Sequence, residues 1–133
     1  MAVVVTIMVG AVTVALPGGS PPVGADGNEA PGAPAAFRQL SAGGSHTCAI
    51  LDTAELKCWG TGSNGRLGIG TTDGRGDTPG ELGDALPAVD LGTGRTAVAV
   101  AAGGLHACAV LDTGRVKCWG DNALGQLGLG DTA

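Results

Sequence analysis

Hydrophobic and polar positions alternate in two stretches of the chain that are almost the same sequence. The first is HTCAILDTAELKCWG at residues 46–60, and the second is HACAVLDTGRVKCWG at residues 106–120. In each stretch, two alternating apolar runs flank a short polar segment centred on Thr53 or Thr113. Alternation with a period of two is typical of strands, and Gly114 in the second polar segment suits a tight turn. Each stretch therefore predicts a β-hairpin.

Apolar and glycine-rich segments surround each predicted hairpin. A short apolar run precedes it, at 37–40 and at 96–101, and leads into Ala-Gly-Gly. The sequences GRLGIG and GQLGLG follow it, and their alternate glycines favour tight turns over a strand. Pro87, Val89 and Leu91 predict a fourth, outer strand, because proline is tolerated at a sheet edge. Three or four short antiparallel strands per unit are typical of one propeller blade.

The two stretches belong to one internal repeat with an offset of sixty residues. Residues 37–73 and 97–133 share 18 identities in 37 aligned positions without a gap. A repeat of this period indicates a solenoid or a propeller. We assign the first repeat to residues 37–95 and the second, truncated repeat to residues 96–133.

The repeat closely resembles the regulator of chromosome condensation repeat. The resemblance rests on the order A-G-G-x-H-x-C-A-hydrophobic-L-D, followed by V-K-C-W-G-D-N-x-x-G-Q-L-G-L-G-D, and it covers roughly residues 37–133. It implies an all-β fold of antiparallel β-propeller blades, about two of the seven that the family commonly has. The residues that carry this signature, and that it implies to be structural, are Gly43, Gly44, His46, Trp59, Gly60, Gly65, Leu67, Gly68, Gly70, Gly103, Gly104, His106, Trp119, Gly120, Asn122, Gly125, Leu127, Gly128 and Gly130.

The first copy departs from this pattern, and the number of copies is small. Thr61-Gly62 stands where Asp-Asn is expected, and Thr71 replaces the final Asp. Because each blade buries its faces only against neighbouring blades, two blades cannot close a ring. The chain is therefore expected to be a piece of a longer repeat protein, a truncated product, or a subunit of a homo-oligomer.

The first segment of the chain is apolar and is predicted to lie outside the repeat fold. Residues 2–16 carry no charge, and the small residues Val23 to Ala25 precede the first charged residue, Asp26. This pattern suits a signal peptide over residues 1–25, although no Lys or Arg precedes the apolar run. A weak membrane anchor and a buried strand are the alternatives. Residues 26–36, rich in Pro, Gly and Ala, predict a disordered linker. Because the first segment suits a signal peptide, the chain is expected to be exported.

Four cysteines occupy repeat-equivalent positions. If each hairpin loop holds three residues, Cys48 lies directly opposite Cys58, and Cys108 lies directly opposite Cys118. We predict two disulfides, which agrees with export. The alternatives are buried reduced cysteines and a zinc site that includes His46 or His106, but a C-x-x-C pair and a suitably placed carboxylate are both missing. No metal and no cofactor is predicted, and the resemblance implies that both histidines pack or hydrogen-bond between blades.

Composition and charge narrow the function classes. Seven basic and twelve acidic residues give a net charge of -5, which disfavours binding to duplex nucleic acid. Aromatic residues make up 2% of the chain, too few for a surface that stacks single-stranded bases. The chain has no G-x-S-x-G nucleophile motif, and its glycine runs lack the Lys-Ser/Thr ending of a phosphate loop. The sequence therefore predicts a protein without enzymatic activity.

These observations favour a non-enzymatic extracytoplasmic module, of bacterial type, that binds a protein or a glycan through its blades. One alternative, implied by the family resemblance, is guanine-nucleotide exchange on a small GTPase. The acidic charge and the export-like segment argue against it. A second alternative is a truncated product with no function of its own, because unpaired blade faces favour aggregation.

Overall fold

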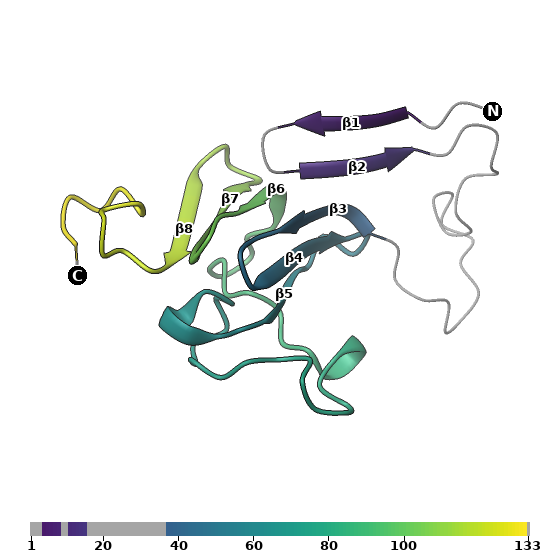
Figure 1. The fold of residues 1–133 in the computed structure, drawn as a ribbon. Helices are drawn as coiled ribbons and strands as arrows, with labels where there is room; N and C mark the ends of the chain where they lie inside the picture. The colour runs from purple at the N-terminus through teal and green to yellow at the C-terminus, as the bar shows by residue number, and fades with distance from the viewer. Residues whose placement is uncertain (1–3, 9–10, 16–36, 133) are drawn as a thin grey trace.

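The computed structural model describes residues 4–8, 11–15 and 37–132, and within these ranges the fold is all-β apart from two short 3-10 turns (Figure 1). The first repeat contributes β3 (Phe37–Ala42), β4 (His46–Leu51) and β5 (Leu56–Gly60). The second contributes β6 (Ala97–Ala102), β7 (His106–Leu111) and β8 (Val116–Gly120). Each set of three strands is an antiparallel meander, so the prediction of antiparallel blades is confirmed. We call β3–β5 blade 1 and β6–β8 blade 2.

The hairpins have the predicted three-residue loops. Cys48 pairs with Cys58 in blade 1, and Cys108 pairs with Cys118 in blade 2. In blade 1 the backbone N–H of Leu51 donates to the carbonyl of Glu55 at 2.9 Å, which closes the loop over residues 52–54. Polar loop residues between two alternating runs therefore determine the strand register, because the turn decides which residues face each other.

The predicted outer strand is reduced to a single bridge. Ala88 pairs with Lys57 on the outer edge of β5, and the N–H of Val89 donates to the carbonyl of Leu56 at 2.7 Å. The side chains of Val89 and Leu91 are buried in the core. The prediction of a full strand here is wrong in extent, because the apolar side chains of this segment leave the sheet edge to join the core.

The hydrophobic core lies between the two blades rather than within either one. Blade 1 and the turn that follows it contribute bulky or sulfur-containing side chains, whereas blade 2 contributes mainly small ones that let the sheets approach closely. The members from the first repeat are Cys48, Ile50, Leu56, Cys58, Leu67, Val89 and Leu91, and those from the second are Ala97, Val100, Ala107, Ala109 and Leu111. Each blade therefore depends on its neighbour for burial, as in other repeat proteins.

Two further strands lie in the apolar N-terminal segment. β1 (Val4–Met8) and β2 (Ala11–Ala15) form an antiparallel hairpin, and Val12 pairs with Leu40, so this hairpin extends the sheet of blade 1. The cleavage or anchoring of residues 1–25 stays a prediction, and the predicted linker at 26–36 lies outside the described residues. Within the described ranges, no helix is long and apolar enough to cross a membrane.

Candidate interaction surface

Both predicted disulfides are present, one in each hairpin. The S–S distances are 2.10 Å for Cys48–Cys58 and 2.09 Å for Cys108–Cys118. Cys48 and Cys58 are completely buried, whereas Cys108 and Cys118 are both half-buried. A disulfide sulfur is not the thiolate that zinc requires, so these cysteines do not form the alternative metal site. Among the described residues, no group of three or more His, Cys, Asp or Glu side chains is placed to hold a metal ion.

The Gly-Gly-x-His signature is a packing unit that occurs once per blade. A Cβ atom on Gly43 would lie 2.6 Å from Cε1 of His46, and one on Gly103 would lie 2.5 Å from Cε1 of His106. Each imidazole ring therefore needs a glycine beneath it. The second glycine of the pair lets the blades approach, because a Cβ atom on Gly44 would lie 2.8 Å from the carbonyl oxygen of Gly104. The N–H of Gly44 donates to the carbonyl of Gly103 at 3.1 Å across the same contact.

His46 is buried without a hydrogen-bond partner. Its side chain is 3% exposed, and neither ring nitrogen has a partner. Burial lowers the pKa of His46, the Arg66 guanidinium and His106 lower it further, and a backbone group of His106 partly opposes them. The expectation that this histidine packs in the fold agrees with its position, and the ring is held in its neutral form.

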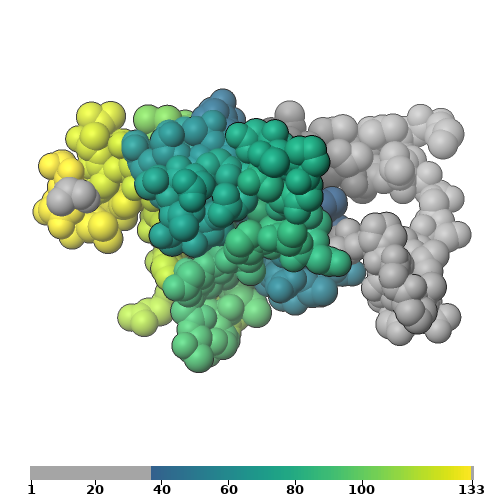
Figure 2. Space-filling model, turned by 90° about the horizontal axis from the view of Figure 1, so that it is seen from below, coloured from purple at the N-terminus to yellow at the C-terminus, as the bar shows by residue number. Residues whose placement is uncertain are grey.

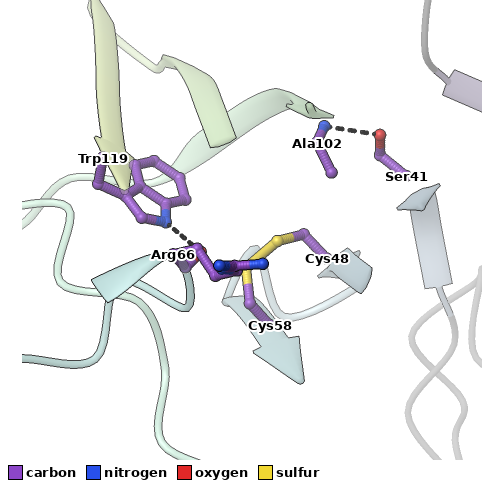
Figure 3. The surroundings of a disulfide bond; sticks show 6 residues. All are labelled: Ser41, Cys48, Cys58, Arg66, Ala102 and Trp119. Atoms are coloured by element: carbon purple, nitrogen blue, oxygen red, sulfur yellow. Dashed lines mark hydrogen bonds between the residues drawn. A yellow bond between two sulfur atoms is a disulfide. The ribbon is translucent and has the colours of Figure 1, made fainter. Parts of the chain in front are cut away.

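Trp119 joins blade 2 to the turn that follows blade 1. Its indole N–H donates to the carbonyl of Arg66 at 3.0 Å (Figure 3). Its acceptor is 53 residues away, on the other repeat, so this hydrogen bond joins the two repeats. Gly68 lies against the same ring, where a Cβ atom would sit 2.8 Å from Nε1 of Trp119. Gly120 lies under the same turn, where its Cβ would be 3.3 Å from the Cα of Arg66.

The glycine-rich runs form successive tight turns, as predicted. After the 3-10 turn η1 (Ser63–Gly65), the N–H of Gly68 donates to the carbonyl of Gly65 at 2.9 Å, and Gly128 donates to Gly125 in the same way at 3.0 Å. Several of these glycines have the positive φ that side chains rarely adopt: Gly60, Gly65, Gly68, Gly70, Gly120, Gly125, Gly128 and Gly130. We call residues 65–68 turn 1 and residues 125–128 turn 2.

The Asp-Asn pair of the second repeat stabilises turn 2. The side chain of Asn122 accepts from the N–H of Leu127 at 3.1 Å and donates to the carbonyl of Asp131 at 3.0 Å. Gly62 stands in the place of Asn122 in the first repeat. A Cβ atom on Gly62 would lie against the backbone of Asp73, so this departure from the signature leaves room for the loop that follows.

Two side chains of β3 clamp the free edge of β6. The amide of Gln39 accepts from the N–H of Val100 and donates to its carbonyl, both at 3.0 Å, and the hydroxyl of Ser41 accepts from the N–H of Ala102 at 2.9 Å (Figure 3). Gln39 and Ser41 are not part of the repeat signature, because the second repeat has Ala99 and Ala101 at the equivalent positions. The one available signal was this difference between the copies.

The face of blade 2 that points away from blade 1 is open. Leu56 of blade 1 is 1% exposed because it lies in the core between the blades, whereas its repeat-equivalent, Val116, is 64% exposed. Ile69 packs against the same core, whereas its equivalent, Leu129, is also 64% exposed. We call this surface, which contains Val116, Leu127 and Leu129, the open face of blade 2.

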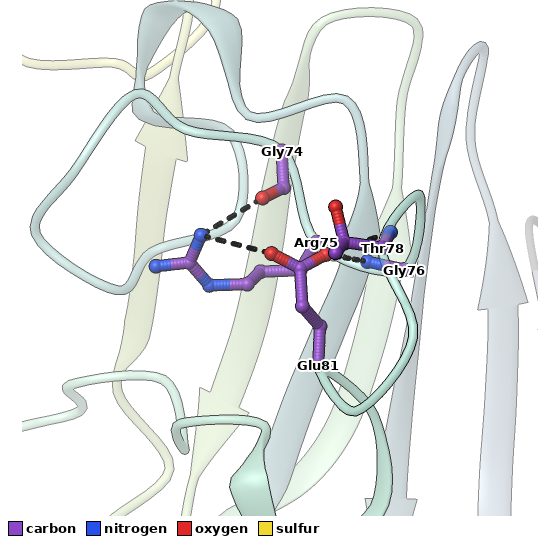
Figure 4. Close-up of polar contacts among 5 residues, drawn as sticks. All are labelled: Gly74, Arg75, Gly76, Thr78 and Glu81. Atoms are coloured by element: carbon purple, nitrogen blue, oxygen red, sulfur yellow. Dashed lines mark hydrogen bonds and ion pairs between the residues drawn. The ribbon is translucent and has the colours of Figure 1, made fainter.

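A cavity of about 460 Å³ lies beside Trp59, on blade 1. It is lined by Ser45, Trp59, Gly60, Thr61, Gly62, Ser63, Thr72, Gly74, Arg75, Gly76 and Asp77. A loop forms one side of the cavity, and Arg75 in this loop donates to the carbonyl of Gly74 at 2.9 Å (Figure 4). Glu81 accepts from the N–H groups of Gly76 and Thr78, at 2.9 and 3.2 Å, and lies 3.8 Å from Arg75. These N–H groups, the Gly76 one above all, lower the pKa of Glu81.

Comparison with known proteins identifies the repeat. The model of the regulator of chromosome condensation (RCC1) repeat matches residues 37–66 and 97–126. The chain is 36% identical over 93 residues to the human probable E3 ubiquitin-protein ligase HERC4, a match that covers 70% of this chain and 8% of HERC4. It is 34% identical over 97 residues to the ultraviolet-B receptor UVR8 of Arabidopsis thaliana, which covers 71% of this chain and 20% of the receptor. The chain thus spans only a small part of the curated relatives that it matches.

Solved structures give matches of similar extent. Yeast RCC1 (Prp20), in its crystal structure with Kap60, matches 68% of this chain with 23% sequence identity and a TM-score of 0.49, over 20% of that chain. The ectodomain of the receptor kinase CR4 from Physcomitrella patens matches 71% of this chain with 24% identity and a TM-score of 0.42.

Proposed function

This chain belongs to the regulator of chromosome condensation repeat family, and we propose that it is a non-enzymatic protein-interaction module that acts outside the cytoplasm. The observation that carries the proposal is the open face of blade 2. Exposed apolar side chains that gather on one face mark an interaction site. Val116 and Leu129 are each 64% exposed on this face, although their repeat-equivalents in blade 1 are in contact with a neighbouring blade.

The structure of the contact between the blades indicates the chemistry of the partner. The buried face of blade 1 receives Ala107, Ala109 and Leu111, which are small or aliphatic side chains on a single strand of blade 2. The open face of blade 2 has nearly the same composition as the face that receives them, with Val110 and Val116 in place of Ile50 and Leu56. The proposed partner is therefore a protein surface that presents a sheet with small apolar residues, such as a further blade of the same family.

The disulfides support the extracytoplasmic part of the proposal. All four cysteines are paired, and no described cysteine is free. Disulfides persist in oxidising compartments and are rare in the cytosol. A fusion of residues 1–36 to a reporter enzyme that is active only outside the cytoplasm tests this part. Activity equal to that of the unfused reporter would contradict export.

Two matched substitutions test the interaction. Val116→Asp puts a charge on the open face of blade 2, and Val98→Asp puts the same charge at a site of similar exposure, 62%, on β6. Each protein is produced in the cells that naturally make it, and the culture is treated with a crosslinker. The Val116→Asp variant is expected to lose a crosslinked partner that wild type and Val98→Asp both retain. Equal crosslinking by all three proteins would contradict an interaction through this face. Circular dichroism checks that both variants remain folded.

A further inference from the structure

We propose that the cavity beside Trp59 is a binding site for a polypeptide turn, and that turn 2 of a second copy of this chain occupies it. The proposal rests on the proposed function for its partner surface, because turn 2 of the second copy includes Leu127 of the open face of blade 2, whereas the cavity that receives it lies on blade 1. Its occupant is a Gly-x-Leu-Gly turn, which the chain carries twice, as Gly-Arg-Leu-Gly at 65–68 and as Gly-Gln-Leu-Gly at 125–128.

The contact between turn 1 and Trp119 is the template for this recognition. The indole N–H of Trp119 donates to the carbonyl of Arg66 at 3.0 Å, and Gly68 is so close to the ring that a Cβ atom there would lie 2.8 Å from Nε1. Leu67, between them, is completely buried in the core. The contact thus combines one hydrogen bond to a backbone carbonyl, one buried leucine and one glycine whose missing side chain leaves room for the indole.

Trp59 occupies the equivalent place in blade 1 without an equivalent partner. It pairs with Thr47 in the same register in which Trp119 pairs with Ala107. Among the described residues, no hydrogen bond of the Trp59 indole N–H corresponds to the one that Trp119 makes to Arg66, and Trp59 lines the cavity of about 460 Å³. A volume of this size is typical of ligand sites. The hydroxyl-bearing residues Thr61, Ser63 and Thr72 line the cavity and suit the polar backbone of a turn.

Turn 2 is the repeat-equivalent of turn 1, but within the described residues no tryptophan indole donates a hydrogen bond to it. It adopts the conformation of turn 1, with positive φ at Gly125 and Gly128 as at Gly65 and Gly68. Leu67 is 0% exposed, whereas its equivalent, Leu127, is only half-buried, and the neighbouring Leu124 is 90% exposed. In Figure 2 the C-terminal segment that carries turn 2 projects from one end of the molecule. A copy of the chain therefore offers both a free turn and a free tryptophan site.

The contact between copies is expected to be weaker than the contact within one chain. Gln39 and Ser41 clamp β6 within the chain, but Ala99 and Ala101 stand at the equivalent positions of blade 2. The same clamp is thus missing between copies. Because the turn and its site lie on different surfaces, the contact is head-to-tail, and it leads to a ring or an open filament.

The two tryptophans provide a direct test by nuclear magnetic resonance. The chain has only two, so its ¹⁵N-correlation spectrum contains two indole N–H signals, and Trp59→Phe assigns them. The probe is a peptide of residues 120–131, GDNALGQLGLGD, which has no tryptophan of its own. Added to the full chain, it is expected to shift the Trp59 signal in a saturable way and to leave the Trp119 signal in place, because that N–H is already bonded to Arg66.

A control peptide and a second measurement make the test decisive. The control carries valine in place of Gly128, since a Cβ at the equivalent Gly68 would lie 2.8 Å from the indole nitrogen, and it is expected not to bind. In the full chain, light scattering is expected to show a native mass that rises with protein concentration, and Trp59→Phe and Gly128→Val are each expected to abolish the rise. An unmoved Trp59 signal, equal binding of both peptides, or association that both variants retain would overturn the proposal. Val116→Asp is expected to leave peptide binding unchanged, which separates this site from the open face of blade 2.

Discussion

At the residue scale, equivalent positions of the two repeats show how one residue type or another fits the same backbone. Ala54 and Gly114 occupy the same loop position, and both have positive φ, +66° and +79°. An alanine in this region costs roughly 1–2 kcal/mol, and glycine adopts it freely but loses more backbone entropy on folding. The sequence predicted the positive φ at Gly114 from the turn chemistry. At Ala54 the residue type does not predict a positive φ, because the three-residue loop imposes this conformation on the alanine.

We predict that Ala54→Gly raises the free energy of unfolding by up to about 1 kcal/mol, because it removes the left-handed strain. Gly114→Ala is the matched reverse change and is expected to lower the free energy of unfolding by a similar amount. Urea unfolding of both variants and wild type measures the two values. A destabilised Ala54→Gly variant would show that the loop does not strain the alanine.

At the element scale, the hairpin is predicted from sequence in nearly complete form. Alternation, a polar centre and the repeated spacing of ten residues between cysteines together specify the strands, the loop and the disulfide. The exposure of each disulfide, by contrast, is not predicted by the hairpin sequence. Cys48 and Cys58 are 0% exposed because blade 2 covers them, whereas the disulfide of blade 2 lies on the side that no neighbouring blade covers. Two hairpins of nearly the same sequence therefore differ in the accessibility of their disulfides.

We predict that a thiol reductant opens Cys108–Cys118 before Cys48–Cys58 under native conditions, because the attacking thiolate must reach a disulfide sulfur. Alkylation at timed intervals followed by mass spectrometry of the two hairpin peptides gives both rates in one sample. The rate for Cys108–Cys118 is expected to be several-fold higher. Equal rates in urea, where both hairpins are exposed, serve as the control, and equal rates without urea would contradict the prediction.

At the scale of the whole molecule, contacts between the blades determine the core and the environment of His46. The imidazole is 3% exposed, and the two charged or titratable groups that face it are Arg66, after blade 1, and His106, on blade 2. A protonated ring would be a buried cation next to a guanidinium. Burial is the largest cause of the lowered pKa of His46. Because the folded state disfavours the protonated ring, acid destabilises it relative to the unfolded chain.

We predict that the free energy of unfolding falls when the pH is lowered below about 6.5, the ordinary pKa of histidine. In that range the unfolded chain binds a proton at His46, but the folded chain, in which the pKa is lowered, does not. The full stability is therefore present above pH 6.5 and decreases until the pH reaches the folded pKa. Thermal unfolding between pH 7.5 and pH 5 measures this slope. His46→Gln is expected to flatten it and His106→Gln to retain most of it, and a slope that His46→Gln leaves intact would assign it to another group.

The sequence by itself determined the repeat, the three strands of each blade, the hairpin register and the cysteine pairs. These features follow from local alternation, turn residues and the equivalence of the two copies, and they need few contacts between distant residues. The tertiary structure alone decided that Trp119 binds the carbonyl of Arg66, that Gln39 and Ser41 clamp β6, and that the segment after Pro87 turns into the core. It also decided which faces of nearly identical blades are buried and which are open. The physical reason is that burial depends on the neighbour that a face meets in space, and two copies of one sequence meet different neighbours.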